Sequence, residues 1–348
     1  MTLLPPVELD GLWEPERPYL NTASFGLPPR TAYAALQRAL EDWRHGRTSW
    51  EPWADCVGAA RAAFARIVGC RIEDVAVGAT VSELVGLVAA SLPDNARVVV
   101  PDVEFTSNLF PWLVQEERGV AVETVPIDRL ADSIDKTTTL VAFSAVQSSS
   151  GEVADVEAIA EAARANDALV FVDATQACGW THVSASSVDF LVCHGYKWLL
   201  APRGTAFLTV RPEQLDLVRP LHAGWWSAPD PYGDFYSPPL RLATDARRLD
   251  TSPAWFSWVG AAPALELLEH IGIEGIGIHN VQLANRFRAG LELEPSNSAI
   301  VTVAVPGAAE KLARAGIAAA VRADRLRVSF HLYNTAADVD AALDALRP

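Results

Sequence analysis

The sequence predicts an α/β protein, with a large domain built on a mostly parallel, doubly wound sheet and a smaller α+β domain after it. From Val75 onward, short apolar runs such as ALVFVD alternate with helix-like stretches such as VADVEAIAEAARAND. Strands covered by helices on both faces of a parallel sheet have this composition. The chain has 348 residues, 50% of them hydrophobic, so it can bury more than one core of ordinary size. We expect the large domain to span 1–255, and the helical connection and small domain to span 256–348.

The elements follow one another in a regular order. Two amphipathic helices are expected over Thr31–His45 and Ala54–Val68, and strands then alternate with helices as far as the run AFLTV. The periodicity disappears between Pro220 and Pro253, in a stretch rich in Pro, Gly, Trp and Tyr. A loop of this length inside a compact protein points to a function. Two helical segments follow, the second near Asn280–Leu291, and the tail reads strand, helix, strand, helix, which is the predicted small domain.

Composition excludes several classes of partner. The net charge of −15 and the lack of a Lys/Arg-rich run argue against nucleic acid, whose binders present a basic face. The N-terminus has no basic region and is broken by Pro5 and Pro6, so we expect neither a signal peptide nor a membrane anchor. The four cysteines have no CxxC spacing, so their pattern predicts neither a disulfide framework nor a metal site. The cysteines are Cys56, Cys70, Cys178 and Cys193. We therefore expect a cytoplasmic protein that binds a small molecule and no metal.

Polar residues at strand ends are the candidate ligand contacts, because ligands bind at the carboxyl ends of strands in open α/β sheets. The strand VAVG leads into Ala79 and Thr80, and the N–H groups of the following helix with the Thr80 hydroxyl form a phosphate cradle. Taken alone, Thr80 would be better explained as a plain helix cap. The strand ALVFVD ends in Asp173, which is costly to bury unless it meets a cation such as a protonated ring nitrogen. A helix-capping aspartate is the alternative.

Lys197 follows the strand DFLVCHG and has aromatic and aliphatic neighbours. Desolvation disfavours its ammonium, which is the condition for a lysine that forms a Schiff base. Taken alone, it could be an ordinary surface lysine. The order of phosphate cradle, Asp173 and Lys197 fits a pyridoxal phosphate site, which needs a lysine and an acidic partner for the ring nitrogen.

Several motifs together resemble one family. They are YLNTASFGLPPR, VEFTSNLFPW, FVDATQA, CHGYKWLLAPRG and LRVSFHLYNTAADVDAAL. The chain resembles, nearly end to end, the class V aminotransferase family of fold-type I pyridoxal phosphate enzymes. This family includes cysteine desulfurases, isopenicillin N epimerase-like proteins and kynureninase-like proteins. The resemblance implies pyridoxal 5'-phosphate as cofactor, an amino-acid substrate and a homodimer with shared active sites.

The resemblance also implies roles for the residues around the cofactor ring. Ala79 and Thr80 match the phosphate-binding turn. Phe105 matches the residue stacked on the pyridine ring, where many relatives have a histidine and others an aromatic residue. Asp173 matches the partner of the ring nitrogen, and Gln176 the group beside the ring hydroxyl.

Further residues are implied at the phosphate and at the substrate. His194 and Tyr196 stand where relatives place phosphate ligands, and Thr251 matches a phosphate contact from the second subunit. Lys197 is expected to carry the cofactor and to shuttle the Cα proton. Arg327 matches the arginine that holds the substrate carboxylate through a fork-shaped pairing.

We expect three segments to shape the substrate pocket. They are the segment Asn21–Gly26 with Ser24 and Phe25, the early Trp-rich segment (Trp43, Trp50, Trp53) and the loop Trp225–Tyr236. Their aromatic residues suggest an apolar substrate side chain, although a packed subunit interface would explain them as well. The pair Trp225 and Trp226 is similar to kynureninase relatives and predicts an aromatic wall near the cofactor or the substrate, with loop packing as the alternative.

One departure from the family pattern bears on the reaction. Cysteine desulfurases carry a nucleophilic cysteine in a loop just before the carboxylate-binding arginine, whereas the stretch AAAVRADRLRVS is short and has none. Persulfide chemistry is therefore disfavoured. Cys178 and Cys193 flank the predicted site, but buried strand cysteines are usually inert.

The leading interpretation is an enzyme that transforms an amino acid through an external aldimine and a quinonoid intermediate. Class V aminotransferase ranks first, a C–S (β-elimination) lyase close behind it, and an epimerase of the isopenicillin N type after both. A nicotinamide-dependent oxidoreductase would need a GxGxxG motif after the first strand, which is missing. A non-catalytic binding protein of this fold would not need Lys197, Asp173 and Arg327 together.

Overall fold

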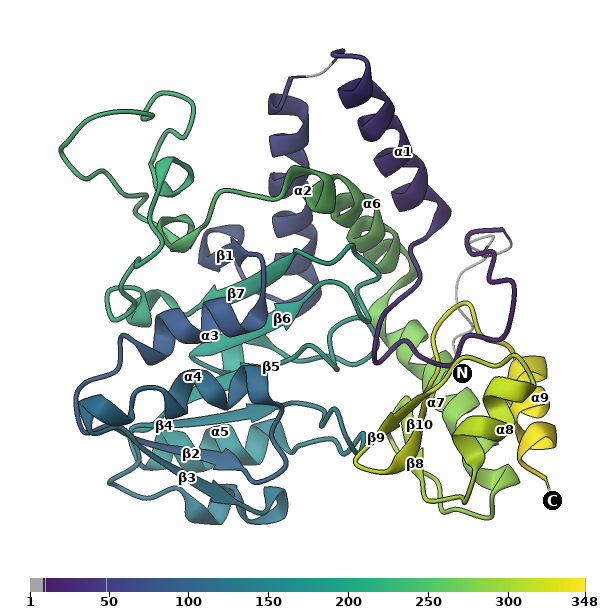
Figure 1. Cartoon of the computed structure of the whole chain (residues 1–348). Coiled ribbons are helices and arrows are strands. Elements are labelled where there is room, and N and C mark those ends of the chain that lie inside the picture. Colours follow the sequence, from purple (N-terminus) through teal and green to yellow (C-terminus); the bar gives the residue numbers. More distant parts are fainter. Residues whose placement is uncertain (1–8, 10, 48, 348) are drawn as a thin grey trace.

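The central sheet dominates the computed structural model, which describes residue 9 and residues 11–47 and 49–347 (Figure 1). Its described strands lie in the order β1-β7-β6-β5-β4-β2-β3. Strands β2 to β6 are mutually parallel, and β7 is antiparallel to its neighbours β6 and β1. The strands are β1 (Val75–Gly78), β2 (Arg97–Pro101), β3 (Ala121–Val125), β4 (Leu140–Ser144), β5 (Leu169–Asp173), β6 (Phe190–His194) and β7 (Ala206–Val210). The predicted α/β fold with a mostly parallel sheet is confirmed.

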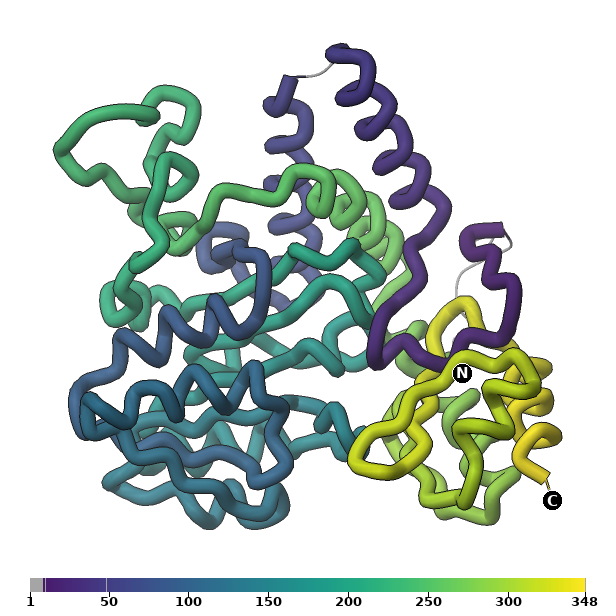
Figure 2. Tube along the Cα trace, viewed as in Figure 1, coloured from purple at the N-terminus to yellow at the C-terminus, as the bar shows by residue number. Residues whose placement is uncertain are grey.

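Helices cover both faces of this sheet, because successive strand residues point to opposite faces. Val170 and Val172 of β5 belong to the core beneath α2, α5 and α6, whereas Phe171 belongs to the core beneath α3 and α4. Helices α1 and α2 both pack against α6, which is far from them in sequence (Figure 2). The helices are α1 (Arg30–Arg44), α2 (Glu51–Val68), α3 (Val81–Ala89), α4 (Phe110–Leu113), α5 (Val156–Ala165) and α6 (Trp255–Ile271).

A second, antiparallel sheet of order β8-β10-β9 lies beside the first and is covered by three described helices. Its elements are α7 (Ile273–Gly290), β8 (Ile300–Val303), α8 (Ala308–Arg314), β9 (Ala320–Arg322), β10 (Arg325–Ser329) and α9 (Ala336–Leu346). The N-terminal segment joins this sheet, since Tyr19 bridges to Ala318 and Asn21 to Ser329. The N-terminal residues thereby reach the small domain, while the division at residue 255 stays a prediction.

Three elements differ from the sequence-based expectation. The stretch SNLFPWLVQEER, one of the helix-like stretches that alternate with the strands, breaks into 3-10 turns and the short α4, because Pro111 lacks an N–H and its ring opposes the carbonyl four residues before it. Helix α7 begins at Ile273, well before Asn280. Strand β9 was not expected, and it turns out to bear on the site.

The long loop before α6 projects from the body of the molecule and contains only short 3-10 turns, at Trp225–Ser227 and Ala246–Leu249 (Figure 1). Among the described helices, none combines the length and the apolar character that a bilayer crossing requires.

Candidate active site

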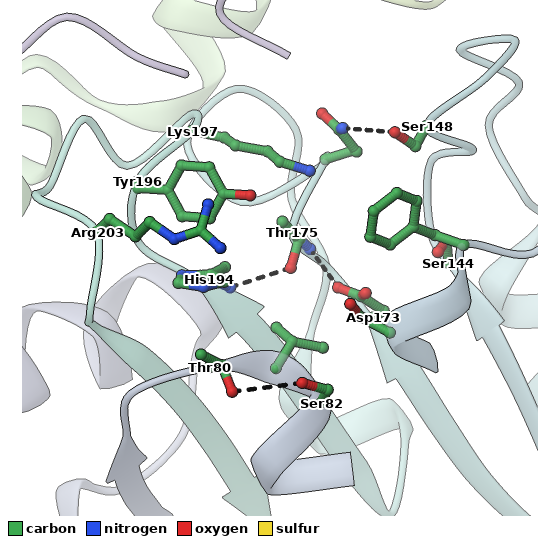
Figure 3. Close-up of a pocket in the computed structure, with 14 residues that line it drawn as sticks. Thr80, Ser82, Ser144, Ser148, Asp173, Thr175, His194, Tyr196, Lys197 and Arg203 are labelled. Carbon is green, nitrogen blue, oxygen red and sulfur yellow. Dashed lines mark hydrogen bonds between the residues drawn. The ribbon is translucent and has the colours of Figure 1, made fainter. Parts of the chain in front are cut away.

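A cavity of about 260 Å³ opens at the carboxyl ends of the parallel strands (Figure 3). The strand register creates it: Ser144 at the end of β4 pairs with Asp173 at the end of β5, and β1 ends just before α3. The lining residues are Thr80, Val81, Ser82, Phe105, Ser107, Ser144, Ser148, Asp173, Thr175, Gln176, His194, Tyr196, Lys197 and Arg203. Most of the residues singled out in the sequence therefore meet in one place.

Asp173 is only 5% exposed and lines this cavity. The backbone N–H of Thr175 donates to its Oδ1 at 2.8 Å. Burial raises the pKa of Asp173, and the Thr175 hydrogen bonds and the nearby Lys197 oppose that rise. A buried carboxylate with so few donors is suited to a cationic ligand atom.

Lys197 lies in the loop after β6 and is 6% exposed. Its Nζ lies 5.4 Å from the ring centre of Phe105 and 5.7 Å from that of Tyr196. The described residues provide no hydrogen-bond acceptor for it. Burial lowers the pKa of Lys197 to about 8, although the Asp173 carboxylate acts in the opposite direction. The amine is thus held in the condition that a nucleophile requires.

Two glycines allow the backbone around Lys197 to be packed closely. A Cβ at Gly26 would lie 2.1 Å from the carbonyl oxygen of Lys197, and the N–H of Gly26 donates to the Tyr196 carbonyl at 2.9 Å. Gly179 has a φ of +109°, and a Cβ there would lie 2.3 Å from the Trp198 carbonyl oxygen. Larger residues at either position would push the lysine loop away, so these glycines hold Lys197 in place.

Thr80 and Ser82 line the end of the cavity opposite Ser148, at the start of α3 (Figure 3). The Thr80 hydroxyl caps the helix by accepting from the N–H of Glu83 at 3.3 Å. The N–H of Ala79 donates to the Glu83 carboxylate at 3.1 Å, and Ala79 does not line the cavity. Thr80 can therefore cap the helix and still present its hydroxyl to a phosphate, whereas the N–H of Ala79 is already bonded to Glu83.

His194 and Tyr196 stand beside this end of the cavity, with ring centres 4.2 Å apart. His194 Nδ1 is buried without a hydrogen-bond partner among the described residues. Burial lowers the pKa of His194 to about 3, so the imidazole is neutral. The Arg203 guanidinium lies 5.1 Å from the ring centre of Tyr196 and lines the same cavity. A polar atom without a hydrogen-bond partner, close to an arginine that has no carboxylate partner in the described part of the chain, is suited to an anion such as phosphate.

Phe105 and Gln176 reach the cavity as expected, and other side chains fix both. The N–H of Phe105 donates to the Glu104 carboxylate at 2.9 Å. Ser144 N–H and Gln147 Nε2 also donate to Glu104, at 2.7 and 3.3 Å. Gln176 donates to the Ala23 carbonyl at 3.0 Å and accepts from Trp198 Nε1 at 2.7 Å. These bonds leave its amide little freedom to turn toward a ligand.

Arg327 on β10 approaches from the small domain and is 1% exposed. It donates to Ser148 Oγ at 3.1 Å and to Ser24 Oγ at 2.8 Å, while its Nε lacks a partner among the described residues. Burial and the nearby Arg322 lower the pKa of Arg327 to about 10, so it stays charged. Phe25 packs on Tyr196 with ring centres 5.4 Å apart. Ser24 and Phe25 therefore lie against Arg327 and Tyr196, and their contact with a substrate stays a prediction.

Some predicted residues lie outside this cavity. The N–H of Thr251 donates to the Val77 carbonyl at 3.3 Å, and its contact with a second subunit stays a prediction. Trp225 and Trp226 pack on each other and on Trp255. Trp50 joins that cluster. Within this chain the packing alternative therefore describes these aromatics, and they give no support to an apolar substrate side chain.

Sequence reasoning did not single out Arg203, Ser148 or Arg322. Arg203 stood inside the quoted motif CHGYKWLLAPRG, and its charge in an acidic chain was a usable signal. Ser148 begins a run of three serines after β4, a polar stretch that has no feature to set one of them apart. Arg322 lies on the unexpected strand β9, so no sequence signal pointed to it.

The turn between β9 and β10 consists of Ala323 and Asp324, both with positive φ. No cysteine lies in this hairpin. Cys178 and Cys193 are both buried, and burial raises the pKa of the Cys193 thiol well above its usual range. The Cys193 thiol is therefore not in the reactive, ionised form.

The fold is that of an α/β protein whose cavity holds a buried lysine and a buried aspartate at adjacent strand ends, beside arginines that have no carboxylate partner among the described residues. The chain matches the family described as Aminotransferase class-V over residues 51–312. It belongs to the class V aminotransferase family, as the sequence motifs indicated.

Proteins similar to this chain are named for different activities. The uncharacterized aminotransferase YcbU of Bacillus subtilis is 29% identical, with 89% of this chain and 90% of that protein aligned. The isopenicillin N epimerase of Streptomyces clavuligerus is 26% identical, over 96% of this chain and 95% of that protein. A solved structure, the cystine C-S lyase C-DES with cysteine persulfide, has a TM-score of 0.85 at 19% identity, over 95% of this chain and 97% of that chain. This last likeness shows the fold alone.

Proposed function

We propose that this chain is a pyridoxal 5'-phosphate-dependent aminotransferase that acts on an α-amino acid. The observation that carries the proposal is Lys197, an amine buried without a hydrogen-bond partner among the described residues, in the same cavity as Asp173. Membership of the class V aminotransferase family brings pyridoxal 5'-phosphate as the cofactor. A buried amine with a lowered pKa would cost stability in a protein that made no use of it.

The cavity fits this cofactor. Thr80, His194 and Arg203 would hold its phosphate, since they offer a hydroxyl at a helix start, an unpartnered ring nitrogen and an unpaired guanidinium. Asp173 would hold the protonated ring nitrogen, and Lys197 the aldehyde carbon. When bound, the cofactor draws electrons away from the substrate Cα and so makes the Cα proton acidic.

The side chains of the protein supply the remaining functions. Lys197 Nζ, whose pKa is lowered to about 8, is partly neutral at neutral pH and would take the proton from the substrate Cα. Arg327 binds the α-carboxylate, for which its unpartnered Nε is available. The Asp173 carboxylate would stabilise the positive charge on the ring nitrogen of the cofactor.

Transamination is preferred to persulfide formation because the β9–β10 turn has two residues and no cysteine. A β-elimination reaction on a sulfur amino acid uses the same lysine and is the main alternative outcome. We also propose a homodimer in which Thr251 contacts the phosphate of the other subunit, and a cytoplasmic location.

The test uses purified holoprotein and a panel of L-amino acids with a keto-acid acceptor. Wild type should be yellow, and borohydride should fix the cofactor on Lys197; Lys197→Ala should show neither fixation nor turnover. Production of a keto acid with transfer of the amine supports the aminotransferase. Pyruvate with a thiol would make the protein a C–S lyase, an inverted enantiomer would make it an epimerase, and a protein that binds no pyridoxal phosphate would refute the proposal.

A further inference from the structure

Two arginines of the small sheet meet at one hydroxyl beside the cavity. Arg327 of β10 donates to Ser24 Oγ at 2.8 Å, and Arg322 of β9 donates to the same atom at 3.2 Å. Arg327 is buried and Arg322 is exposed. Neither guanidinium forms an ion pair with an Asp or Glu among the described residues, so the small sheet presents two uncompensated positive charges at one point.

This arrangement is unfavourable without an anion. Burial and the neighbouring Arg322 together lower the pKa of Arg327, and Arg322 also lowers the pKa of Lys197. Like charges at short distance repel, and a hydroxyl cannot neutralise them. The chain as a whole carries a net charge of −15, and carboxylates pair with arginines at many other places in it. Among the described residues Arg322 and Arg327 have no such partner, and for the buried Arg327 this is costly unless a ligand anion meets the two guanidinium groups.

The cations around the cavity outnumber the anions of the ligands assigned so far. Arg203 faces the end lined by Thr80 and His194, where the cofactor phosphate is proposed to bind. Arg327, which contacts Ser148 at the opposite end, is proposed to bind the α-carboxylate. Arg322 has no anion assigned to it.

We infer that the substrate is an acidic α-amino acid, and that Arg322 binds the carboxylate of its side chain. This inference rests on the proposed function and specifies its substrate class. A guanidinium can bind a carboxylate through two parallel hydrogen bonds, which gives both affinity and selection against the neutral amide. The exposed position of Arg322 at the rim allows it to reach side chains of more than one length.

The test compares kcat/KM of the holoenzyme for L-aspartate and L-glutamate with that for L-asparagine and L-glutamine. Wild type should prefer at least one acid over its amide. Arg322→Gln should lower kcat/KM for that acid by about 10- to 100-fold, the size of a lost charge-assisted hydrogen bond, and change the amide by less than about threefold. Arg325→Gln on the same hairpin is the matched control and should leave both values unchanged, since among the described residues the Arg325 guanidinium donates only to the Thr302 carbonyl.

Two kinetic results would overturn the inference while leaving the proposed function standing. One is turnover of amides or apolar amino acids as efficient as that of both acids. The other is an equal loss for acid and amide in Arg322→Gln, which would mean that both arginines bind the α-carboxylate.

A binding measurement separates the two proposals if no amino acid is turned over. Glutarate should bind the holoenzyme at least about tenfold more tightly than butyrate in calorimetry, and Arg322→Gln should abolish the difference. Equal binding of glutarate and butyrate by wild type would refute the acidic-substrate inference by itself.

Discussion

The pKa of Lys197 sets how fast the apo-protein should capture its cofactor at each pH. Only the neutral amine attacks an aldehyde, and a lysine is neutral above its pKa. Burial lowers the pKa of Lys197 from 10.5 to about 8. At pH 7 the neutral fraction then rises from about one in 3,000 to about one in ten, a gain of roughly 300-fold. The capture rate should increase with pH and level off above about 8.

Two substitutions should move this midpoint in opposite directions. The Asp173 carboxylate raises the pKa of Lys197, so Asp173→Asn should shift the midpoint below that of wild type. Arg327 lowers that pKa, so Arg327→Met should shift the midpoint upward. Opposite shifts cannot come from a general loosening of the fold, which would expose Lys197 in both variants and raise its pKa in both.

The assay incubates apo-protein with pyridoxal phosphate from pH 6 to 10, stops it with borohydride, and quantifies the peptide carrying Lys197 by mass spectrometry. Lys136, whose exposed ammonium donates to the Asp167 carboxylate at 3.0 Å, is the internal control and should be labelled far more slowly at pH 7. A wild-type midpoint near 10, or shifts of the same sign in both variants, would refute the argument.

The remaining predictions concern stability, measured by urea unfolding of the holoprotein. His331 is buried and neutral: its Nδ1 accepts from the Leu332 N–H, and burial lowers its pKa to about 3. The unfolded chain therefore binds a proton that the folded chain excludes. The free energy of unfolding consequently falls as the pH drops from about 6.5 toward 3. Between pH 7.5 and 5 this loss should be about 2 kcal/mol, and an equal loss in His331→Gln would contradict it. Asp250→Asn should cost about 3–5 kcal/mol because it leaves Arg61 charged and buried, whereas Asp340→Asn on the surface should leave the urea midpoint nearly unchanged; similar midpoints for the two variants would contradict the reasoning.

The sequence was sufficient for the fold and for the residues that end parallel strands. Apolar runs that alternate with helices indicate a parallel sheet, and the carboxyl ends of its strands share one edge. The sequence alone therefore places Asp173, Thr80 and Lys197 close together. The lysine's low pKa also followed from its neighbours, since Trp198 and Leu199 are fully buried beside it. Local pattern determines these features.

Residues brought in by tertiary packing could not be predicted. Ser24 reaches Arg327 only because the N-terminal segment pairs with the small sheet at Asn21. Arg322 lies on β9, which is joined to β10 by a two-residue turn and is too short to show a periodic pattern in the sequence. The role of the tryptophans stayed open for a related reason: composition does not say which surface an aromatic residue covers, and Trp225 covers other aromatics of its own chain.

The basic side chains of the site have different roles because burial lowers the pKa of each to a different value. Desolvation lowers the pKa of Lys197 to about 8, that of His194 to about 3 and that of Arg327 to about 10. At neutral pH the arginine is still charged, the histidine is neutral, and the lysine is near its midpoint. Guanidinium groups therefore suit the task of holding anions at fixed positions, and the lysine alone can gain and lose a proton during each turnover. An arginine in place of Lys197 would keep its charge and lose the chemistry, so the lysine is required by its pKa as well as by its position.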